Sequence, residues 1–257
     1  MWFSRTEREM EAFISIRNLH KKLGRQEVLR GFDLDVQHGE TLVVIGRSGG
    51  GKSVLLKHII GLMKPTVGEI HFEGRNITVL SERQLTPIRK KIAILFQSAA
   101  LFDSMSVEEN IAFPLRESGI TDESLIAQKV ATALEVVDLA GEQKKMPENL
   151  SGGMKKRVGL ARAIVGEPAC ILYDEPTTGL DPIVADSINH LIRRLQKQLQ
   201  VTSIVVTHDM KSAFHVANQV AYLHEGRIYF KGTPEELQAS ADPLVQDFIL
   251  GRSGDTD

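Results

Sequence analysis

Cysteine and aromatic residues are scarce in this chain of 257 residues. It has a single cysteine, Cys170, and phenylalanine, tyrosine and tryptophan together make up 5% of the sequence. One thiol cannot form an internal disulfide or a multi-cysteine metal site, which fits a reducing compartment, and Cys170 is expected to be a core residue. With 42% apolar residues, the chain is still long enough to bury the core of one large globular domain.

The chain also lacks a long hydrophobic run and an excess of charge of either sign. No apolar run approaches the roughly 20 residues that span a bilayer, and Met1 to Glu11 is charged, without a signal-peptide core. Lysine plus arginine (31) nearly balances aspartate plus glutamate (33), so no overall basic field indicates nucleic-acid binding. We therefore expect a cytoplasmic protein without a nucleic-acid partner, whose role at a membrane would depend on another protein.

A phosphate-binding motif is present at residues 46–53. It matches G-x-x-x-x-G-K-[ST], the P-loop or Walker A pattern, between an apolar strand-like run (Thr41 to Ile45) and a helical pattern. The glycines let main-chain N–H groups approach a phosphate chain, and the helix N-terminus adds partial positive charge. Lys52 would reach the β- and γ-phosphates, and the Ser53 hydroxyl would hold Mg²⁺. The predicted nucleoside triphosphate site comprises Gly46, Arg47, Ser48, Gly49, Gly50, Gly51, Lys52 and Ser53.

Strands and helices alternate along the rest of the chain. Strands are predicted within 12–36 (two, with a turn at 23–26), 68–74, 92–96, 169–173, 201–207, 220–223 and 228–230. Helices are predicted after the P-loop, at 81–91, at three places between 98 and 166, after Asp181, and near Pro234 and Pro243. We predict one domain with a sheet core (1–97 and 167–232), a helical subdomain (98–166), and C-terminal helices with a frayed tail (233–257).

Two adjacent acids, Asp174 and Glu175, end the apolar run that starts at Ala169. Neighbouring residues leaving a strand point in different directions, so the two carboxylates have different tasks. The first can support Mg²⁺, and the second can polarise a water for attack on the γ-phosphorus. An acidic strand end that only meets solvent is the alternative, and it is less common beside a complete P-loop.

A second anion-binding helix end is predicted at Leu150-Ser151-Gly152-Gly153-Met154. These small residues precede a helical segment rich in Lys155, Lys156 and Arg157. Small residues at a helix N-terminus leave main-chain N–H groups open to an anion. The chain therefore has two helix N-termini that are predicted to bind phosphate.

Together with Gln97 at a strand end, Thr178 to Asp181, and His208 after residues 204–207, these motifs resemble the ATP-binding subunit of ABC transporters. The resemblance runs from about residue 13 to residue 230 and contains every expected motif in order. It implies an α/β protein with the P-loop NTPase fold of ABC ATPases. In that fold a RecA-like sheet core carries an antiparallel β layer and an inserted helical subdomain.

The resemblance also implies a role for single residues in MgATP hydrolysis. Glu175 would be the catalytic base, His208 the γ-phosphate sensor, and Gln97 a contact of both Mg²⁺ and the attacking water. The implied metal ligands are Ser53, Gln97 and Asp174. In place of the family's usual aromatic that stacks on adenine, this chain has Leu23, so base contact is expected to be apolar packing.

A further implication is a head-to-tail homodimer, because one chain cannot complete a site. Ser151, Gly152 and Gly153 of one subunit would meet the γ-phosphate held by the P-loop of the other, and Asp181 would also contact the partner. The signature ends in Met154 rather than the commoner glutamine. Because serine and the glycines make the phosphate contacts, we expect activity to survive this change.

Residues 95–102 and 110–116, with Leu-Ser-Gly-Gly-Met, resemble the Mla or Mce-type branch of the family. That branch powers phospholipid movement between the inner and outer membranes of bacteria and maintains outer-membrane lipid asymmetry. The implied partners are an MlaE-like permease, an MlaB-like STAS-domain protein and an MlaD-like MCE-domain protein, at the cytoplasmic face of the inner membrane. The alternative is that residues 97–116 are the general permease-docking surface of any ABC importer or lipoprotein-release exporter.

Two functions from other classes agree less well with the sequence. A nucleic-acid-linked ABC ATPase would need a coiled-coil insertion, a second cassette or a basic patch, and the sequence shows none. A regulatory nucleotide-binding module without turnover would be expected to lack Glu175 or His208, and both are present.

Overall fold

The structure is a computed structural model that describes residues 12–252, in two compact units. The first unit contains the described residues up to 86 and from 206 onward, and the second contains residues 87–205. The boundaries fall inside helix α3 (Glu82–Arg89) and strand β8 (Thr202–Thr207).

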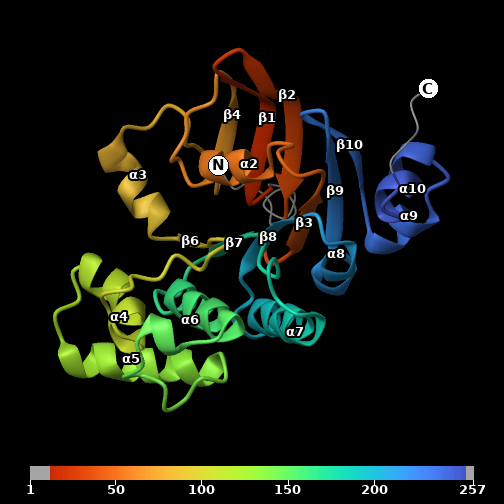
Figure 1. Ribbon diagram of the computed structural model, residues 1–257. Helices are drawn as coiled ribbons and strands as arrows, with labels where there is room; N and C mark the ends of the chain where they lie inside the picture. The colour runs from red at the N-terminus through yellow and green to blue at the C-terminus, as the bar shows by residue number, and fades with distance from the viewer. Residues whose placement is uncertain (1–11, 253–257) are drawn as a thin grey trace, which may run out of the picture. The chain divides into compact units, whose positions relative to one another are not determined.

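An antiparallel sheet forms one layer of the first unit. Its strands are β1 (Ile14–Leu23), β2 (Gln26–Val36), β4 (Val67–Phe72) and β5 (Arg75–Asn76), in the order β2-β1-β4-β5 (Figure 1). Ile14 is opposite Val36 on one neighbour and Phe72 on the other. All three side chains are buried, because residues directly opposite each other on neighbouring strands point to the same face of the sheet.

The strand that leads into the P-loop belongs to a second sheet. Strand β3 (Thr41–Ile45) is buried throughout and pairs in parallel with β9 (Gln219–His224), which forms a hairpin with β10 (Arg227–Gly232). Helix α2 (Lys52–Ile59) follows the P-loop, and α8 (Met210–Val216) packs against β3. This unit therefore contains the whole P-loop and its flanking elements.

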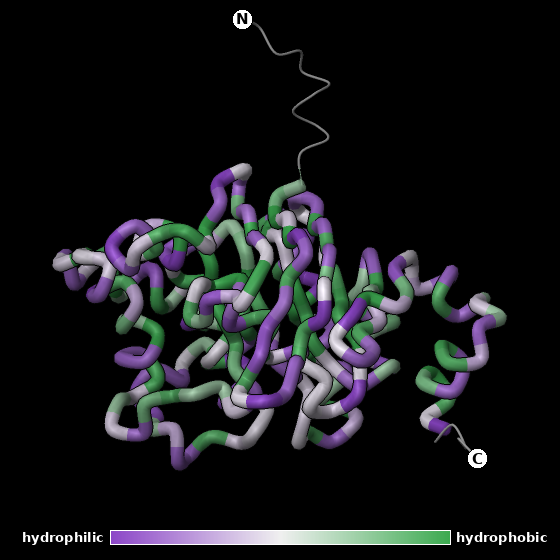
Figure 2. Tube along the Cα trace, turned by 90° about the horizontal axis from the view of Figure 1, so that it is seen from above, coloured by the Kyte–Doolittle hydropathy of each residue, from purple (hydrophilic) through white to green (hydrophobic). Residues whose placement is uncertain are grey.

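Two short helices, α9 (Pro234–Ala239) and α10 (Pro243–Ile249), end the described chain. Green and purple segments alternate along them near the label C in Figure 2, which is the pattern of amphipathic helices. Their contact with the sheet includes Phe248, whose ring stacks on Tyr222 of β9 at a centroid distance of 4.5 Å.

The second unit is organised around helix α6 (Gly152–Ile164). This helix packs against α4 (Val107–Glu117), α5 (Glu123–Val136), α7 (Pro182–Leu199) and strand β6 (Ile92–Leu95). Strand β6 pairs in parallel with β7 (Cys170–Asp174), with Ile92 opposite Cys170 and Leu95 opposite Tyr173. A single 3-10 turn, η1 (Pro147–Asn149), precedes α6.

The sequence-based element order is confirmed, with three omissions. The predicted capping box of Ser106 and Glu109 is present at the start of α4. Of the box predicted at α3, one bond is present: Ser81 N–H donates to Gln84 Oε1, while the Ser81 hydroxyl donates to the same oxygen. The three elements that no local pattern predicted are β5, η1 and α8. Cys170 is fully buried, as predicted, and burial raises the pKa of its thiol.

The predicted subdomain segment, residues 98–166, lies wholly within the second unit, together with β6, β7 and α7. Its boundaries at 98 and 166 stay a prediction. The charged start (residues 1–11) and most of the predicted tail lie outside the described residues. Among residues 12–252, no helix combines the length and hydropathy needed to cross a membrane.

Candidate functional site

At three positions of the P-loop, the backbone conformation or the space available favours glycine over any other residue. Gly49 and Gly51 have φ angles of 76° and 101°, which side chains with a Cβ rarely adopt. At Gly46 the constraint is space, since a Cβ there would lie 2.5 Å from the main-chain oxygen of Leu223 on β9. The motif's glycines therefore follow from the geometry of the turn between β3 and α2.

The N-terminus of α2 has the charge distribution that suits an anion. Its N-cap, Gly51, offers no side-chain hydrogen bond, and the first turn has no acidic residue. The helix dipole favours negative charge at this end. Lys52 is 5% exposed, and its ammonium donates to the main-chain oxygens of Gly46 (2.8 Å) and Arg47 (3.2 Å). These features fit a polyphosphate.

The first unit also holds His208, which directly follows β8 and is exposed. The next residue, Asp209, caps α8 by accepting from the N–H of Lys211 and donates its own N–H to Thr207 Oγ1. Helix α8 in turn packs against β3. His208 is therefore held between two ordered elements on the carboxyl side of β8.

In the second unit, Gln97, Asp174 and Glu175 lie at or just after the carboxyl ends of neighbouring parallel strands. Leu95 of β6 is opposite Tyr173 of β7, so residues that follow these two positions emerge at the same edge. Gln97 is exposed and Asp174 is half-buried. The oxygens of Gln97, Asp174 and Ser53 are hard donors of the kind that Mg²⁺ prefers. Ser53 is exposed in the first unit.

Glu175 directly follows β7 and does not continue the strand conformation, because its φ angle is 49°. Strand alternation, on which the sequence argument relied, therefore does not decide how its carboxylate points relative to that of Asp174. Glu175 is 8% exposed, and Thr178 Oγ1 donates to its Oε2 at 3.3 Å. A buried, hydrogen-bonded carboxylate at a strand end suits a general base.

The signature residues lie where two helices begin. Ser151 caps α6 and accepts from the N–H of Met154 at 3.3 Å. Asp181 caps α7, accepting from the N–H groups of Ile183 and Val184. The two glycines of the signature lie close to side chains at or just before the start of α7. A Cβ on Gly153 would lie 2.5 Å from Val184 Cγ1, and one on Gly152 would lie 3.3 Å from Leu180 Cδ2.

Lys156 lies near these groups, and sequence analysis assigned it no role beyond its place in a basic segment. It is 4% exposed, and its ammonium donates to the main-chain oxygens of Gln97 and Glu175. A lysine among buried positions of a helix is the signal that could have identified it, because lysine is almost never buried without a partner.

Two predicted apolar contacts are at the surface. Leu23, at the tip of the β1–β2 hairpin, is 43% exposed. Phe102 is 42% exposed, and its ring lies 4.9 Å from that of Phe113 of α4 and 6.0 Å from the guanidinium carbon of Arg162. Both have apolar surface to offer a ligand or partner.

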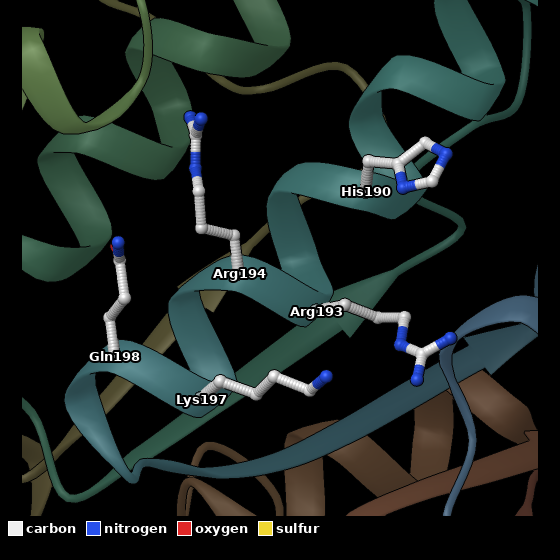
Figure 3. A pocket seen from close by; sticks show the side chains of 5 residues that line it. All are labelled: His190, Arg193, Arg194, Lys197 and Gln198. Carbon is white, nitrogen blue, oxygen red and sulfur yellow. The ribbon is translucent and has the colours of Figure 1, made fainter.

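A basic cavity of about 470 Å³ runs along α7, lined by His190, Arg193, Arg194, Lys197 and Gln198 (Figure 3). Arg194 and Gln198, one turn apart, project to the same side of the helix in that view. Arg194 is already hydrogen-bonded to Asp138 Oδ2 at 2.9 Å. None of the predicted nucleotide-site residues lines this cavity.

Comparison with known proteins identifies the family. A family model described as ABC transporter matches residues 29–178. The chain is 42% identical over 240 residues to the intermembrane phospholipid transport system ATP-binding protein MlaF of Haemophilus influenzae. That alignment covers 93% of this chain and 91% of the MlaF protein. It is 40% identical over 243 residues to the probable ribonucleotide transport ATP-binding protein mkl of Mycobacterium leprae. That alignment covers 95% of this chain and 70% of the mkl protein.

The fold agrees with a solved structure of the same kind. An ATP-binding cassette dimer in a post-hydrolysis state, bound to ADP and Pi, superposes with a TM-score of 0.79 at 30% identity, covering 86% of this chain and 98% of that one. The resemblance and the fold class inferred from the sequence are thus confirmed. This chain belongs to the ABC transporter family and has the α/β fold of its ATP-binding cassettes.

Proposed function

We propose that the chain is the ATP-hydrolysing subunit of an ABC transporter that moves phospholipid between the inner and outer membranes and so maintains outer-membrane lipid asymmetry. The observation that carries this proposal is a complete P-loop that leads directly into helix α2, in a chain 42% identical to an MlaF protein over nearly all of both sequences. The protein would act as a peripheral subunit at the cytoplasmic face of the inner membrane.

ATP is bound first, in this proposal, by the P-loop. The N–H groups at the start of α2 and the ammonium of Lys52 meet the phosphates, and Lys52 exchanges its contacts with Gly46 and Arg47 for phosphate oxygens. Ser53, Gln97 and Asp174 would hold Mg²⁺, which neutralises charge on the β- and γ-phosphates when bound. Leu23 would supply apolar contact to the base.

Hydrolysis then depends on Glu175. Its carboxylate takes a proton from water as the water oxygen bonds to the γ-phosphorus and the bond to the bridging oxygen breaks, with ADP as the leaving group. Gln97 would orient the water and His208 would contact the γ-phosphate. Burial of Glu175 and its hydrogen bond from Thr178 support this role, because a base must be fixed relative to the water.

The working unit is proposed to be a homodimer. Ser151, Gly152 and Gly153 begin α6 with N–H groups that can face a phosphate, and they would act on ATP held by the partner subunit. Asp181 would contact the partner as well. An MlaE-like permease would bind the ATPase dimer, and MlaB-like STAS-domain and MlaD-like MCE-domain proteins would complete the complex.

The test of the chemistry is Glu175→Gln. This change keeps the size of the side chain and removes the base, so turnover should fall by about 10² to 10⁴ while ATP binding persists and an ATP-bound dimer accumulates. Glu167→Gln, at an exposed carboxylate paired with Lys129, is the matched control and should hydrolyse ATP normally. Steady-state hydrolysis near the wild-type rate in Glu175→Gln would refute the assignment.

The substrate is tested in cells that lack the protein. Phospholipid should appear in the outer leaflet of the outer membrane, detergent sensitivity should rise, and wild-type protein but not Lys52→Ala should restore both. The name of the Mycobacterium leprae relative makes ribonucleotide transport the second candidate. Cells that keep lipid asymmetry but lose transport of labelled ribonucleotide would favour that function instead.

A further inference from the structure

Lys156 places a buried ammonium between two segments of the second unit. It lies in the first half of α6 and is 4% exposed. Its Nζ donates to the main-chain oxygen of Gln97 at 2.5 Å and to that of Glu175 at 3.4 Å. Removing an ammonium from water is costly unless it is hydrogen-bonded or paired, so these contacts are what makes the buried position tolerable.

The two acceptors are the main chains of residues to which the proposed hydrolysis assigns direct roles. Gln97 follows β6 and Glu175 follows β7, and the two strands are paired in register. Lys156 therefore ties together the two chain segments that leave this edge of the sheet. Burial lowers the pKa of Lys156, and electrostatic attraction to Asp174 and Glu175 offsets only part of that effect.

The backbone conformation of Glu175 is one that depends on contacts of this kind. A non-glycine residue at a φ of 49° is in a sparsely populated conformation that persists only when its surroundings fix it. The ammonium bonded to its carbonyl oxygen, together with the Thr178 hydroxyl on its carboxylate, fixes both the main chain and the side chain.

We propose that Lys156 is a positioning residue for ATP hydrolysis, which holds the main chain of Gln97 and Glu175 so that their side chains meet the attacking water. The inference rests on the proposed ATPase function. Lys156 also lies three residues after Gly153 in the same helix, so it connects the signature end of α6 directly to the hydrolytic residues.

The experiment compares Lys156→Met, which keeps the length of the side chain without a donor, with Lys156→Gln, which keeps a neutral donor on a shorter chain. Lys144→Met, at a lysine 85% exposed and paired with Glu108, is the control. For each protein, kcat and KM for MgATP are measured below its thermal midpoint, with nucleotide affinity determined separately.

The expected result is a kcat of Lys156→Met lowered by about 10- to 100-fold with KM within a factor of about three, because misplacement of catalytic groups affects turnover more than binding. Lys156→Gln should be intermediate, and Lys144→Met should match wild type. If Lys156→Met does not fold, Lys156→Gln decides: a reduced kcat at unchanged KM supports the inference.

Three results would overturn it. A folded Lys156→Met or Lys156→Gln protein with wild-type kcat would show that the contacts do not position catalytic groups. If the variants keep the wild-type kcat and only bind ATP more weakly, Lys156 would be assigned to nucleotide binding. Wild-type protein without ATP turnover would overturn the proposed function as well, whereas wild-type turnover with equal turnover in the variants overturns this inference alone.

Discussion

At the scale of single residues, the P-loop is most sensitive to added volume at Gly46. The obstacle there is the main-chain oxygen of Leu223, and a carbonyl in the paired strand β9 cannot move aside as a flexible side chain could. A methyl group at this position would push the first residue of the loop away from the strand that orders it.

We therefore expect Gly46→Ala to destabilise the protein by about 1 to 3 kcal/mol, the usual cost of overpacking, and to weaken ATP binding because the loop is displaced. Gly166→Ala is the matched control, since a Cβ at Gly166 meets no atom within 4 Å. Urea unfolding and nucleotide titration measure the two effects. Equal stability and affinity in the two variants would show that the loop can shift without cost.

At the scale of elements, Asp138 joins three helices of the second unit. It lies just beyond α5, and its Oδ2 accepts from Arg157 of α6 at 2.7 Å and from Arg194 of α7 at 2.9 Å. The same two guanidinium groups donate to the main-chain oxygens of Val137 and Val136. The φ of Asp138 is 58°, which aspartate and asparagine tolerate better than most residues.

The hydrogen bond from Arg194, with that from Arg157, holds the pKa of Asp138 below its ordinary value of 3.8. A carboxyl with a lowered folded-state pKa stabilises the protein above its unfolded-state pKa, and this stabilisation is lost as pH falls through the folded value. Asp138→Asn should cost less than about 1 kcal/mol at pH 7, because the carboxylate is half exposed.

The cost of Asp138→Asn should then shrink below about pH 4, the region in which free aspartate titrates. Thermal midpoints of wild type and variant at pH 7 and pH 3 measure this, with Asp103→Asn in an exposed loop as the control. A difference in midpoint that stays the same at both pH values would mean that shape, rather than charge, holds the three helices together.

The apolar segment before α4 is also held by one side chain. Asn110 is fully buried; its Oδ1 accepts from the N–H of Phe102 at 2.8 Å, and its Nδ2 donates to the oxygens of Phe102 and Met105. These bonds order the main chain beneath the exposed ring of Phe102, so the surface is preformed. A preformed apolar surface suits a membrane-protein partner, because less conformational freedom is lost when the two bind.

Replacing Leu101 and Phe102 together by alanine should release the ATPase from its permease in detergent extracts, because both apolar side chains are removed. Nucleotide binding by the isolated subunit should stay close to wild type, since the P-loop is unchanged. Val79→Ala, at a side chain 74% exposed, is the control and should leave co-purification unaffected. Retention of the permease by the double variant would place the docking surface elsewhere.

At the scale of the whole molecule, the proposed dimer takes Lys52 from one chain and Ser151 from the other at each site. Lys52→Ala and Ser151→Arg subunits should each be inactive, the first because it binds ATP weakly and the second because a bulky cation replaces the cap of α6. A mixed dimer would contain one intact site, so mixing the two inactive proteins should restore part of the ATPase activity.

The measurement is the ATPase rate as a function of the mixing ratio, with a maximum expected near equal amounts. Each variant mixed with itself is the control. Ser151→Arg protein that hydrolyses ATP normally by itself would remove the signature from the active site. A mixture that stays inactive, while mass measurement shows that mixed dimers form, would contradict a site shared in this way.

The sequence by itself determined the features that local rules can specify. The P-loop was predictable because its glycines, lysine and helix are contiguous, and the φ angles of Gly49 and Gly51 follow from that turn. Strand alternation and capping residues predicted nearly every element, as the caps at Ser106 and Asp181 show. The order of the motifs, rather than any one of them, supported the family.

Tertiary structure alone decided how residues distant in sequence meet. No local pattern indicates that Lys156 reaches the main chain of Gln97, 59 positions away, or that Arg194 reaches Asp138, 56 positions away. Such contacts depend on how α6 and α7 pack, and packing is fixed by the summed burial of many side chains. Helix α8 and strand β5 were missed for the same reason: they are short, and short elements gain most of their stability from tertiary contacts rather than from their own propensity.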